Sequence, residues 1–335
     1  MSRKDTNTSQ EAHYQIQLPA GFAAMQTQVA GHIFDSATMG LLQDNSGCVL
    51  KPLGKPECGE RELNFYESLQ LNDSNPLLMQ LRAFVPKFHK KVKLVVNNRH
   101  HMFIKLEDLT YGMQKPCIID IKIGKRTWDP PATEQKRHVE EQKYVKCKQL
   151  LGLCVPGFQV YTPTEPSKAL RYSKEYGKNL DANGFRTTIA LFVNAQNGKV
   201  YKPLVYEILS QLYKIREWFK MQKLYNFYAS SILIVYDFDK LESYLQQNCE
   251  GQYAYDYNRV SNMIVNGDAL NSHNAHTIVT TNTTELYSTD FKLAHWIKVK
   301  MIDFAHVFPA ADQSSDDNYI FGLENLVIVF EELLA

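Results

Sequence analysis

The stretch PCIIDIKIG, from Pro116 to Gly124, decides how this chain is expected to fold. It is an apolar run in which Asp120 and Lys122 lie two residues apart, so both side chains project from one face of a β-strand. The alternating positions are all isoleucine, which predicts core packing behind the charged pair. Two opposite charges on one face of a buried strand predict a small site for an anion and its counter-cation.

Composition indicates an intracellular protein with more than one lobe. The chain has 335 residues, which exceeds the usual size of a single core, and its hydrophobic content of 44% is sufficient for a packed interior. The net charge of +1 gives no overall field for nucleic acid or membrane, so an anionic ligand must be held by local basic groups. Six scattered cysteines, no leader and no transmembrane run predict a protein of the nucleus and cytoplasm, and a monomer is expected.

The order of patterns predicts a small β-rich lobe followed by a larger lobe. Residues 1–27 are polar and are expected to be a disordered tail. The small lobe, 28–109, is predicted to hold one helix, 59–69, and four strands, 29–34, 48–53, 93–97 and 102–106. The lobe at 110–335 is predicted to hold helices at 132–150, 203–224 and 318–334, strands at 116–124, 230–236 and 296–302, and a flexible loop at about 266–290.

Two separate positions suggest phosphate and metal chemistry. Lys51 lies in a predicted strand and Glu62 in the helix that follows, the arrangement by which kinase-like lobes hold a cation against nucleotide phosphates. Asp303 ends the apolar run WIKVKMI, where a carboxylate suits Mg²⁺. Each has a plain alternative, since Lys51 and Glu62 could be solvated and Asp303 could cap a turn.

The remaining polar patterns leave their meaning open. The predicted helix at 132–150 carries Lys136, Arg137 and Lys143, which could bind a phosphate-bearing ligand, but the interleaved glutamates favour a solvated face. His306 fits either a polar core residue or a ligand contact. The chain has no GxxxxGK[ST], GxGxxG or HRD segment, so P-loop and protein-kinase motifs are absent.

Four ordered segments resemble the inositol polyphosphate kinase family. PCIIDIKIG resembles the family's PxxxDxKxG motif, and the later segments are SSILIVYD at 230–237, IDFAH at 302–306 and DNYIFGLENL at 317–326. VAGHIFD at 29–35 and RELNFYESL at 61–69 resemble the family's small lobe, so the similarity covers about residues 28–335. The Trp-Asp-Pro at 128–130 is most similar to the multikinase branch, with the trisphosphate 3-kinases and hexakisphosphate kinases as alternatives.

The resemblance implies an α+β, two-lobed kinase-like fold that uses ATP and Mg²⁺, with a helical inositol phosphate-binding segment at about 130–185. It implies nucleotide contacts at Lys51, Glu62, Glu107, Leu109, Asp120 and Ser231. It implies catalytic roles for Lys122, Asp120 and Asp303, with Asp303 as the metal ligand. It implies substrate contacts at Lys122, Lys136, Arg137, Lys143, Lys174, Lys178 and His306. One departure is Cys58, which stands where a substrate-binding basic residue is expected.

The implied reaction is phosphorylation of ring hydroxyls, from inositol trisphosphate to the tetrakis- and pentakisphosphate. Such transfer needs mainly positioning and cations around the phosphoryl group, and the implied residues would supply both. A phosphoinositide lipid headgroup is a further candidate partner, whereas contact with nucleic acid is not expected. A hypothesis of another class is a non-catalytic signalling or transcriptional scaffold, for which the presence of Lys51, Asp120, Lys122 and Asp303 is unfavourable.

Overall fold

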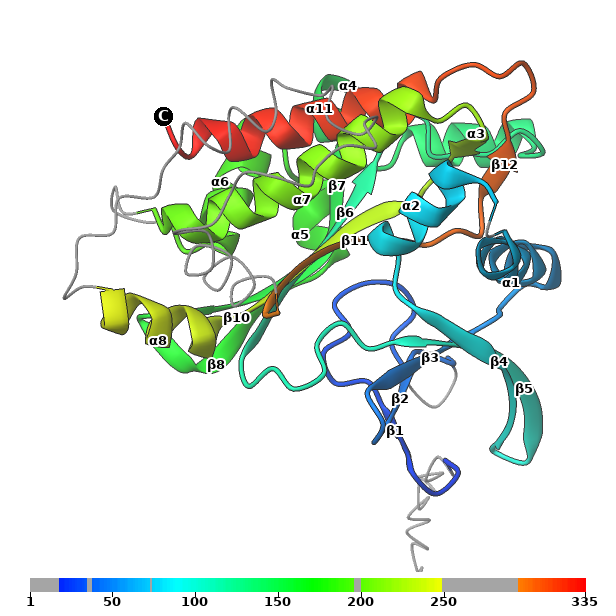
Figure 1. The fold of residues 1–335 in the computed structure, drawn as a ribbon, viewed down its shortest axis with the longest axis horizontal. Coiled ribbons are helices and arrows are strands. Elements are labelled where there is room, and N and C mark those ends of the chain that lie inside the picture. The colour runs from blue at the N-terminus through cyan, green and yellow to red at the C-terminus, as the bar shows by residue number, and fades with distance from the viewer. Residues whose placement is uncertain (1–17, 35–37, 73, 196–199, 249–294) are drawn as a thin grey trace, which may run out of the picture.

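A computed structural model describes residues 18–34, 38–72, 74–195, 200–248 and 295–335, which form two lobes, each built on a five-stranded antiparallel sheet (Figure 1). The expected flexible loop at about 266–290 and residues 1–17 of the expected tail lie outside the described residues. No described helix combines the length and the apolar character that a membrane crossing requires.

The small lobe holds a sheet with strand order β1-β2-β3-β5-β4. Its strands are β1 Phe22–Ala24, β2 Leu42–Asp44, β3 Cys48–Pro52, β4 Phe88–Val96 and β5 Arg99–Glu107. The expected strand at 29–34 is wrong, because these residues form a loop, and β1 lies within the segment 1–27 that was expected to be disordered.

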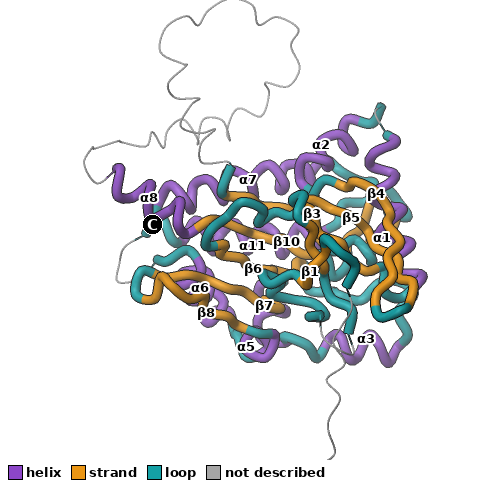
Figure 2. The backbone as a smooth tube through the Cα atoms, turned by 90° about the horizontal axis from the view of Figure 1, so that it is seen from below, coloured by secondary structure: helices purple, strands orange, loops and turns teal. Residues whose placement is uncertain are grey.

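The small lobe has two helices, α1 Pro56–Leu71 and α2 Pro76–Phe84, so the prediction of a single helix is also wrong. Each has a proline in its first turn, where the missing N–H is not needed, and the Asn75 side chain caps α2. Figures 1 and 2 both place α2 next to α7, Lys202–Met221, of the larger lobe. The Trp218 indole on α7 donates to the Leu77 carbonyl at 2.8 Å, which ties the lobes together.

The larger lobe is arranged around the strand that carries PCIIDIKIG. Its sheet has the order β11-β10-β6-β7-β8. The strands are β6 Pro116–Ile123, β7 Leu153–Thr162, β8 Glu165–Tyr172, β10 Ser231–Asp237 and β11 Ile297–Ile302. Because β6 is the central strand, and is buried along nearly all its length, Asp120 and Lys122 are presented by a rigid element.

Helices and a small two-stranded sheet complete the larger lobe. The remaining helices are α3 Glu134–Glu141, α4 Val145–Leu151, α5 Lys174–Lys178, α6 Ala182–Phe192, α8 Phe238–Asn248 and α11 Asp317–Glu332. Strands β9 Tyr225–Phe227 and β12 Val307–Pro309 pair with each other. α7 and α11 pack together, and their apolar faces enter a hydrophobic core that continues into α1 and β3 of the small lobe.

The helix expected at 132–150 is in fact two helices. α3 ends near Gln142 and α4 begins after Tyr144, whose φ of 56° places it in the left-handed region that non-glycine residues rarely adopt. A left-handed residue cannot continue a right-handed helix, so the axis changes direction at this point. Lys136 and Lys143 therefore do not share one face of a continuous helix.

Candidate active site

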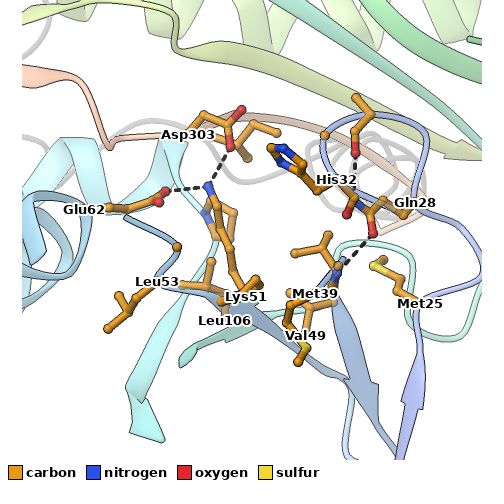
Figure 3. A pocket seen from close by; sticks show the side chains of 18 of the residues that line it. Met25, Gln28, His32, Met39, Val49, Lys51, Leu53, Glu62, Leu106 and Asp303 are labelled. Carbon is orange, nitrogen blue, oxygen red and sulfur yellow. Dashed lines mark hydrogen bonds and ion pairs between the residues drawn. The ribbon is translucent and has the colours of Figure 1, made fainter. Parts of the chain in front are cut away.

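Lys51 and Glu62 form an ion pair that also includes Asp303 from the other lobe (Figure 3). The Lys51 Nζ lies 2.8 Å from Glu62 Oε1 and 2.6 Å from Asp303 Oδ1. Burial alone would lower the pKa of the Lys51 amine, but the two carboxylates outweigh burial and raise its pKa well above the usual value. Lys51 therefore carries a fixed positive charge where the lobes meet.

Asp303 is held in place by the residues on both sides of it. It directly follows β11 and has a φ of 65°, a left-handed conformation that costs energy in any residue with a side chain. The next ring, Phe304, stacks on Phe65 of α1 with centroids 4.2 Å apart, and the Ser230 hydroxyl donates to the Asp303 carbonyl at 2.8 Å. These contacts maintain the strained turn that directs the carboxylate toward the lysines.

Lys122 approaches the other oxygen of the same carboxylate. Its Nζ lies 3.3 Å from Asp303 Oδ2, and it also donates to the Ala229 carbonyl at 2.8 Å and the Ser231 hydroxyl at 3.3 Å. Burial would raise the pKa of Asp303, but the charges of Lys51 and Lys122 lower it well below its usual range. One carboxylate thus stays ionised between two amines at every physiological pH.

Asp120 lies in the same strand two residues from Lys122, and its side chain is also buried. Its Oδ1 has no hydrogen-bond partner among the described residues. Burial raises the pKa of Asp120 to about 6, although the neighbouring charge of Lys122 lowers it. A buried carboxylate oxygen without a partner, in a cleft, is an available acceptor for a ligand hydroxyl or cation.

These charged groups lie beside a cavity of about 980 Å³ between the lobes. Its walls include Glu107 at the end of β5, Leu109 from the connection that follows, and Ile118, Leu233 and Ile302 from the larger sheet. Figure 3 shows the opposite wall, where Met25, Gln28, His32 and Met39 line the cavity. A flat apolar floor with a polar connection at one end and cations at the other suits a nucleotide.

The connection after β5 is held by polar contacts of its own. The Asp108 carboxylate accepts from the Thr110 backbone N–H at 2.8 Å and from the Thr110 hydroxyl at 2.7 Å. The Glu107 carboxylate lies 3.4 Å from the Lys298 amine of β11. These contacts fix the side chains around the connection.

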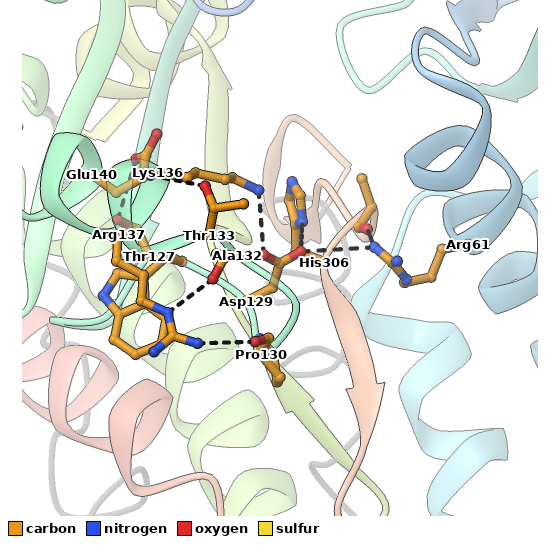
Figure 4. A network of polar contacts seen from close by, with 12 residues as sticks. Arg61, Thr127, Asp129, Pro130, Ala132, Thr133, Lys136, Arg137, Glu140 and His306 are labelled. Atoms are coloured by element: carbon orange, nitrogen blue, oxygen red, sulfur yellow. Dashed lines mark hydrogen bonds and ion pairs between the residues drawn. The ribbon is translucent and has the colours of Figure 1, made fainter.

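A second group of charges surrounds Asp129 (Figure 4). This buried carboxylate lies 2.7 Å from His306 Nδ1, 3.3 Å from Lys136 Nζ and 4.0 Å from Arg61 Nη1. Burial would raise the pKa of Asp129, but His306 and Lys136 lower it. The carboxylate holds together the Arg61 guanidinium of α1, the Lys136 amine of α3 and the imidazole of the IDFAH segment.

Arg61 was missed in the analysis of the sequence, which noted only that Cys58 replaces an expected basic residue. Arg61 lies within the segment RELNFY, one helical turn later, so a basic residue was present nearby. Its guanidinium donates to the Ala305 carbonyl at 2.6 Å and lies 4.3 Å from the centre of the Phe308 ring. Asp129 was likewise named only as part of a motif.

The other expected substrate residues are not gathered at Asp129. Lys143 pairs with Glu140 at 2.7 Å, and Lys178 pairs with Glu175 at 2.9 Å, both as exposed neighbours on the surface. Lys174 begins α5, which packs against β7 and β8. Arg137 is directed toward Trp128 and nearby carbonyl groups, as described below.

The two lobes, the interlobe cavity and the paired lysines on Asp303 define a kinase-like phosphotransferase. The model of the family described as inositol polyphosphate kinase matches residues 103–331. The chain belongs to the inositol polyphosphate kinase family.

Individual relatives agree with this family. The chain is 28% identical to inositol polyphosphate multikinase of Homo sapiens, over 98% of this chain and 92% of that protein. It is 32% identical to inositol polyphosphate multikinase alpha of Arabidopsis thaliana, over 63% of this chain and 77% of that protein. The fold is similar to that of the crystal structure of inositol phosphate multikinase Ipk2 from S. cerevisiae in complex with ADP and Mn²⁺, with a TM-score of 0.59. The two sequences are 20% identical, and the match covers 86% of this chain and 99% of that chain.

Proposed function

We propose that this chain transfers the terminal phosphoryl group of ATP to ring hydroxyls of inositol trisphosphate and then of the tetrakisphosphate. The observation that supports this most is the approach of Lys51 and Lys122 to the two oxygens of Asp303, at 2.6 and 3.3 Å. These groups come from β3, β6 and the end of β11, and Lys51 and Asp303 among them line the nucleotide-sized cavity. Phosphoryl transfer depends on such cations around the group in transfer.

The donor set fits ATP with Mg²⁺. Asp303 stays ionised because of its low pKa, and Asp120 has a buried oxygen without a partner among the described residues. Mg²⁺ usually takes one or two protein carboxylates together with phosphates and water, and these two aspartates could supply the carboxylates. When bound at Asp303, Mg²⁺ would neutralise charge on the phosphate oxygens.

Each charged group of the cleft can then be given one task. Lys51, fixed by Glu62, would bind the nucleotide phosphates, and Lys122 would stabilise the phosphoryl group during transfer. Leu109 would offer its backbone to the adenine, and Asp120 would orient the nucleotide ribose. Arg61, Lys136 and His306 around Asp129 would bind the inositol phosphates, because two cations and an imidazole close together can donate to several phosphate groups.

The test is an assay of the purified full chain with ATP, Mg²⁺ and inositol trisphosphate, analysed by anion-exchange chromatography. We expect inositol tetrakisphosphate first and pentakisphosphate later, with no product after chelation of the metal or in the Lys122→Ala variant. Inositol hexakisphosphate as acceptor tests the hexakisphosphate kinase alternative. Arrest at the tetrakisphosphate would favour the trisphosphate 3-kinase alternative, and absence of any product would refute the proposal.

Three further expectations extend the same proposal. A phosphoinositide headgroup presents the same phosphates as the soluble substrate, so mixed micelles containing phosphatidylinositol bisphosphate would test it as an acceptor. A monomer is expected to elute at its chain mass of 38.6 kDa in size-exclusion chromatography with light scattering. Localisation in the nucleus and cytoplasm stays a prediction from the sequence, and imaging of a tagged full chain would test it.

A further inference from the structure

Trp128 lies between two guanidinium groups from different parts of the chain. The Arg126 Cζ is 3.6 Å from the centre of the indole, and the Arg137 Cζ is 4.6 Å from it. Cations over the face of an indole are attracted by its quadrupole, and tryptophan gives the strongest of these contacts. The stack thus joins Arg137 of α3 to the segment that follows β6.

The Arg126 side of the stack is anchored to the core of the larger lobe. The Arg126 backbone N–H donates to Asn318 Oδ1 at 2.8 Å, and Asn318 Nδ2 donates back to the Arg126 carbonyl at 3.0 Å. Asn318 lies in the first turn of α11, whose apolar residues enter the hydrophobic core. The Arg126 guanidinium also donates to the Trp128 carbonyl at 3.0 Å, which fixes the position of the indole.

The Arg137 guanidinium donates hydrogen bonds to backbone carbonyls of the turn before α3. Its Nε donates to the Ala132 carbonyl at 2.9 Å and its Nη2 to the Pro130 carbonyl at 3.3 Å (Figure 4). The Trp128 indole N–H in turn donates to Glu141 Oε1 at 3.2 Å, at the far end of α3. The donors of Arg137 are therefore directed toward the turn before α3, whereas Lys136 beside it reaches Asp129.

α3 has no residue in the core, so polar contacts hold it, namely those just described and the contacts of Glu140 with Thr127 and Lys148. None of its eight residues is buried, so the hydrophobic effect does not fix its position. Lys136 is the α3 residue that reaches the cation cluster around Asp129. A small rotation of this helix would separate the Lys136 amine from Asp129 and His306.

We propose that Arg137 is a positioning residue, which together with Trp128 holds α3 so that Lys136 faces the inositol phosphate, and that Arg137 itself does not bind phosphate. This proposal rests on the proposed function, because its main measurement is the KM for the inositol substrate. It gives Trp128, which follows the strand of the reaction centre by only a few residues, a role in substrate affinity.

A double-mutant cycle tests the proposal in the full-length protein. We expect Arg137→Ala and Trp128→Leu each to raise the KM for inositol trisphosphate by roughly three- to thirtyfold, the scale of a cation–π contact, with the KM for ATP and kcat nearly unchanged. Because both residues act through one contact, the double variant should be no worse than the poorer single variant. Arg137→Lys and Trp128→Phe should restore most of the affinity, and Val139→Ala, at an exposed position on the same helix, is the matched control.

Two results would overturn the proposal while leaving the proposed function intact. One is additive loss in the double variant, and the other is an unchanged KM in Trp128→Leu together with a raised KM in Arg137→Ala, which would make Arg137 a phosphate ligand. Tryptophan fluorescence gives a readout that does not need activity. Subtracting the spectrum of Trp128→Phe from that of wild type isolates the emission of Trp128. The same subtraction between Arg137→Ala and the double variant Arg137→Ala with Trp128→Phe should give a shifted spectrum. An identical difference spectrum would mean that the stack does not form, and an inactive wild type would refute the proposed function instead.

Discussion

The Lys51 amine of the small lobe lies 2.6 Å from the Asp303 carboxylate of the larger lobe, although 252 positions separate the two residues. This contact crosses the cleft and brings a strand lysine to the left-handed turn after β11. The same carboxylate also holds Lys122, so the contact organises the charges on which phosphoryl transfer would depend.

Replacement of Asp303 by Asn should lower kcat by about 10³-fold or more, the scale on which single charge stabilisers act in phosphoryl transfer. The amide keeps the shape of the side chain but neither binds Mg²⁺ well nor balances two lysines. Initial rates with ATP and inositol trisphosphate measure the effect, and Asp312→Asn, an exposed aspartate further along the chain, is the control. Turnover close to that of wild type in Asp303→Asn would remove this residue from the reaction centre.

The pH dependence of activity should report Asp120. If its ionised form is needed, kcat/KM should fall about tenfold per pH unit below the pKa of Asp120, which burial raises to about 6. Asp120→Asn should be less active and should lack this acidic limb. A wild-type profile that stays flat down to pH 5 would contradict the assignment.

Asp120 should also affect stability in a pH-dependent way. Its pKa is raised on folding from 3.8 to about 6, so its contribution to stability is present at low pH and is lost as the pH rises through about 6. At pH 7 the wild type carries a buried charge that Asp120→Asn lacks. Urea unfolding at pH 4.5 and pH 7 should therefore show the variant gaining stability relative to wild type at the higher pH, and an equal difference at both would oppose this account.

Gly157 should be required for nucleotide affinity. It pairs with Asp120 across β6 and β7, and a Cβ at this position would lie 2.0 Å from the Val29 carbonyl oxygen, in the loop that lines the cavity. Backbone must move to accept it, so Gly157→Ala should raise the KM for ATP and cost about 1–3 kcal/mol of stability. Gly184→Ala is the matched control, because its Cβ would meet side-chain atoms and no backbone, with Leu180 Cδ2 at 3.1 Å and Asp181 Oδ1 at 3.4 Å.

Asp316 should contribute to stability through two hydrogen bonds. Its Oδ2 accepts from the Phe227 N–H at 2.6 Å and its Oδ1 from the Tyr319 N–H at 3.0 Å, so it connects β9 to the start of α11. Asp316→Ala leaves both buried donors unsatisfied and should cost about 1–3 kcal/mol or more, with Asp316→Asn intermediate because an amide has one acceptor oxygen. Chemical denaturation measures this, with the exposed neighbour Asp317→Asn as control.

The elements that could be predicted from the sequence are those with strong local patterns. The apolar strands β6, β10 and β11 and the amphipathic helices α7 and α11 lie close to their expected positions, because a β-rich apolar run or a helical periodicity is clear in each. β7 was missed because Pro156 and Gly157 interrupt its apolar run, and because a strand that is buried on both faces shows no alternation. α2 had a signal that was not used, an asparagine cap followed by proline.

Sequence by itself determined which charged groups are available and which strand or helix carries most of them. Lys51, Glu62, Asp120, Lys122 and Asp303 could each be proposed from local pattern, because a charge beside a buried apolar run is visible without coordinates. Tertiary structure decided which charges meet. It joined Lys51 to Asp303, gathered Arg61, Lys136 and His306 around Asp129, and directed Arg137 onto Trp128. Such pairings depend on the lobe packing and on a left-handed turn at Tyr144, which follow from the whole core rather than from any single segment.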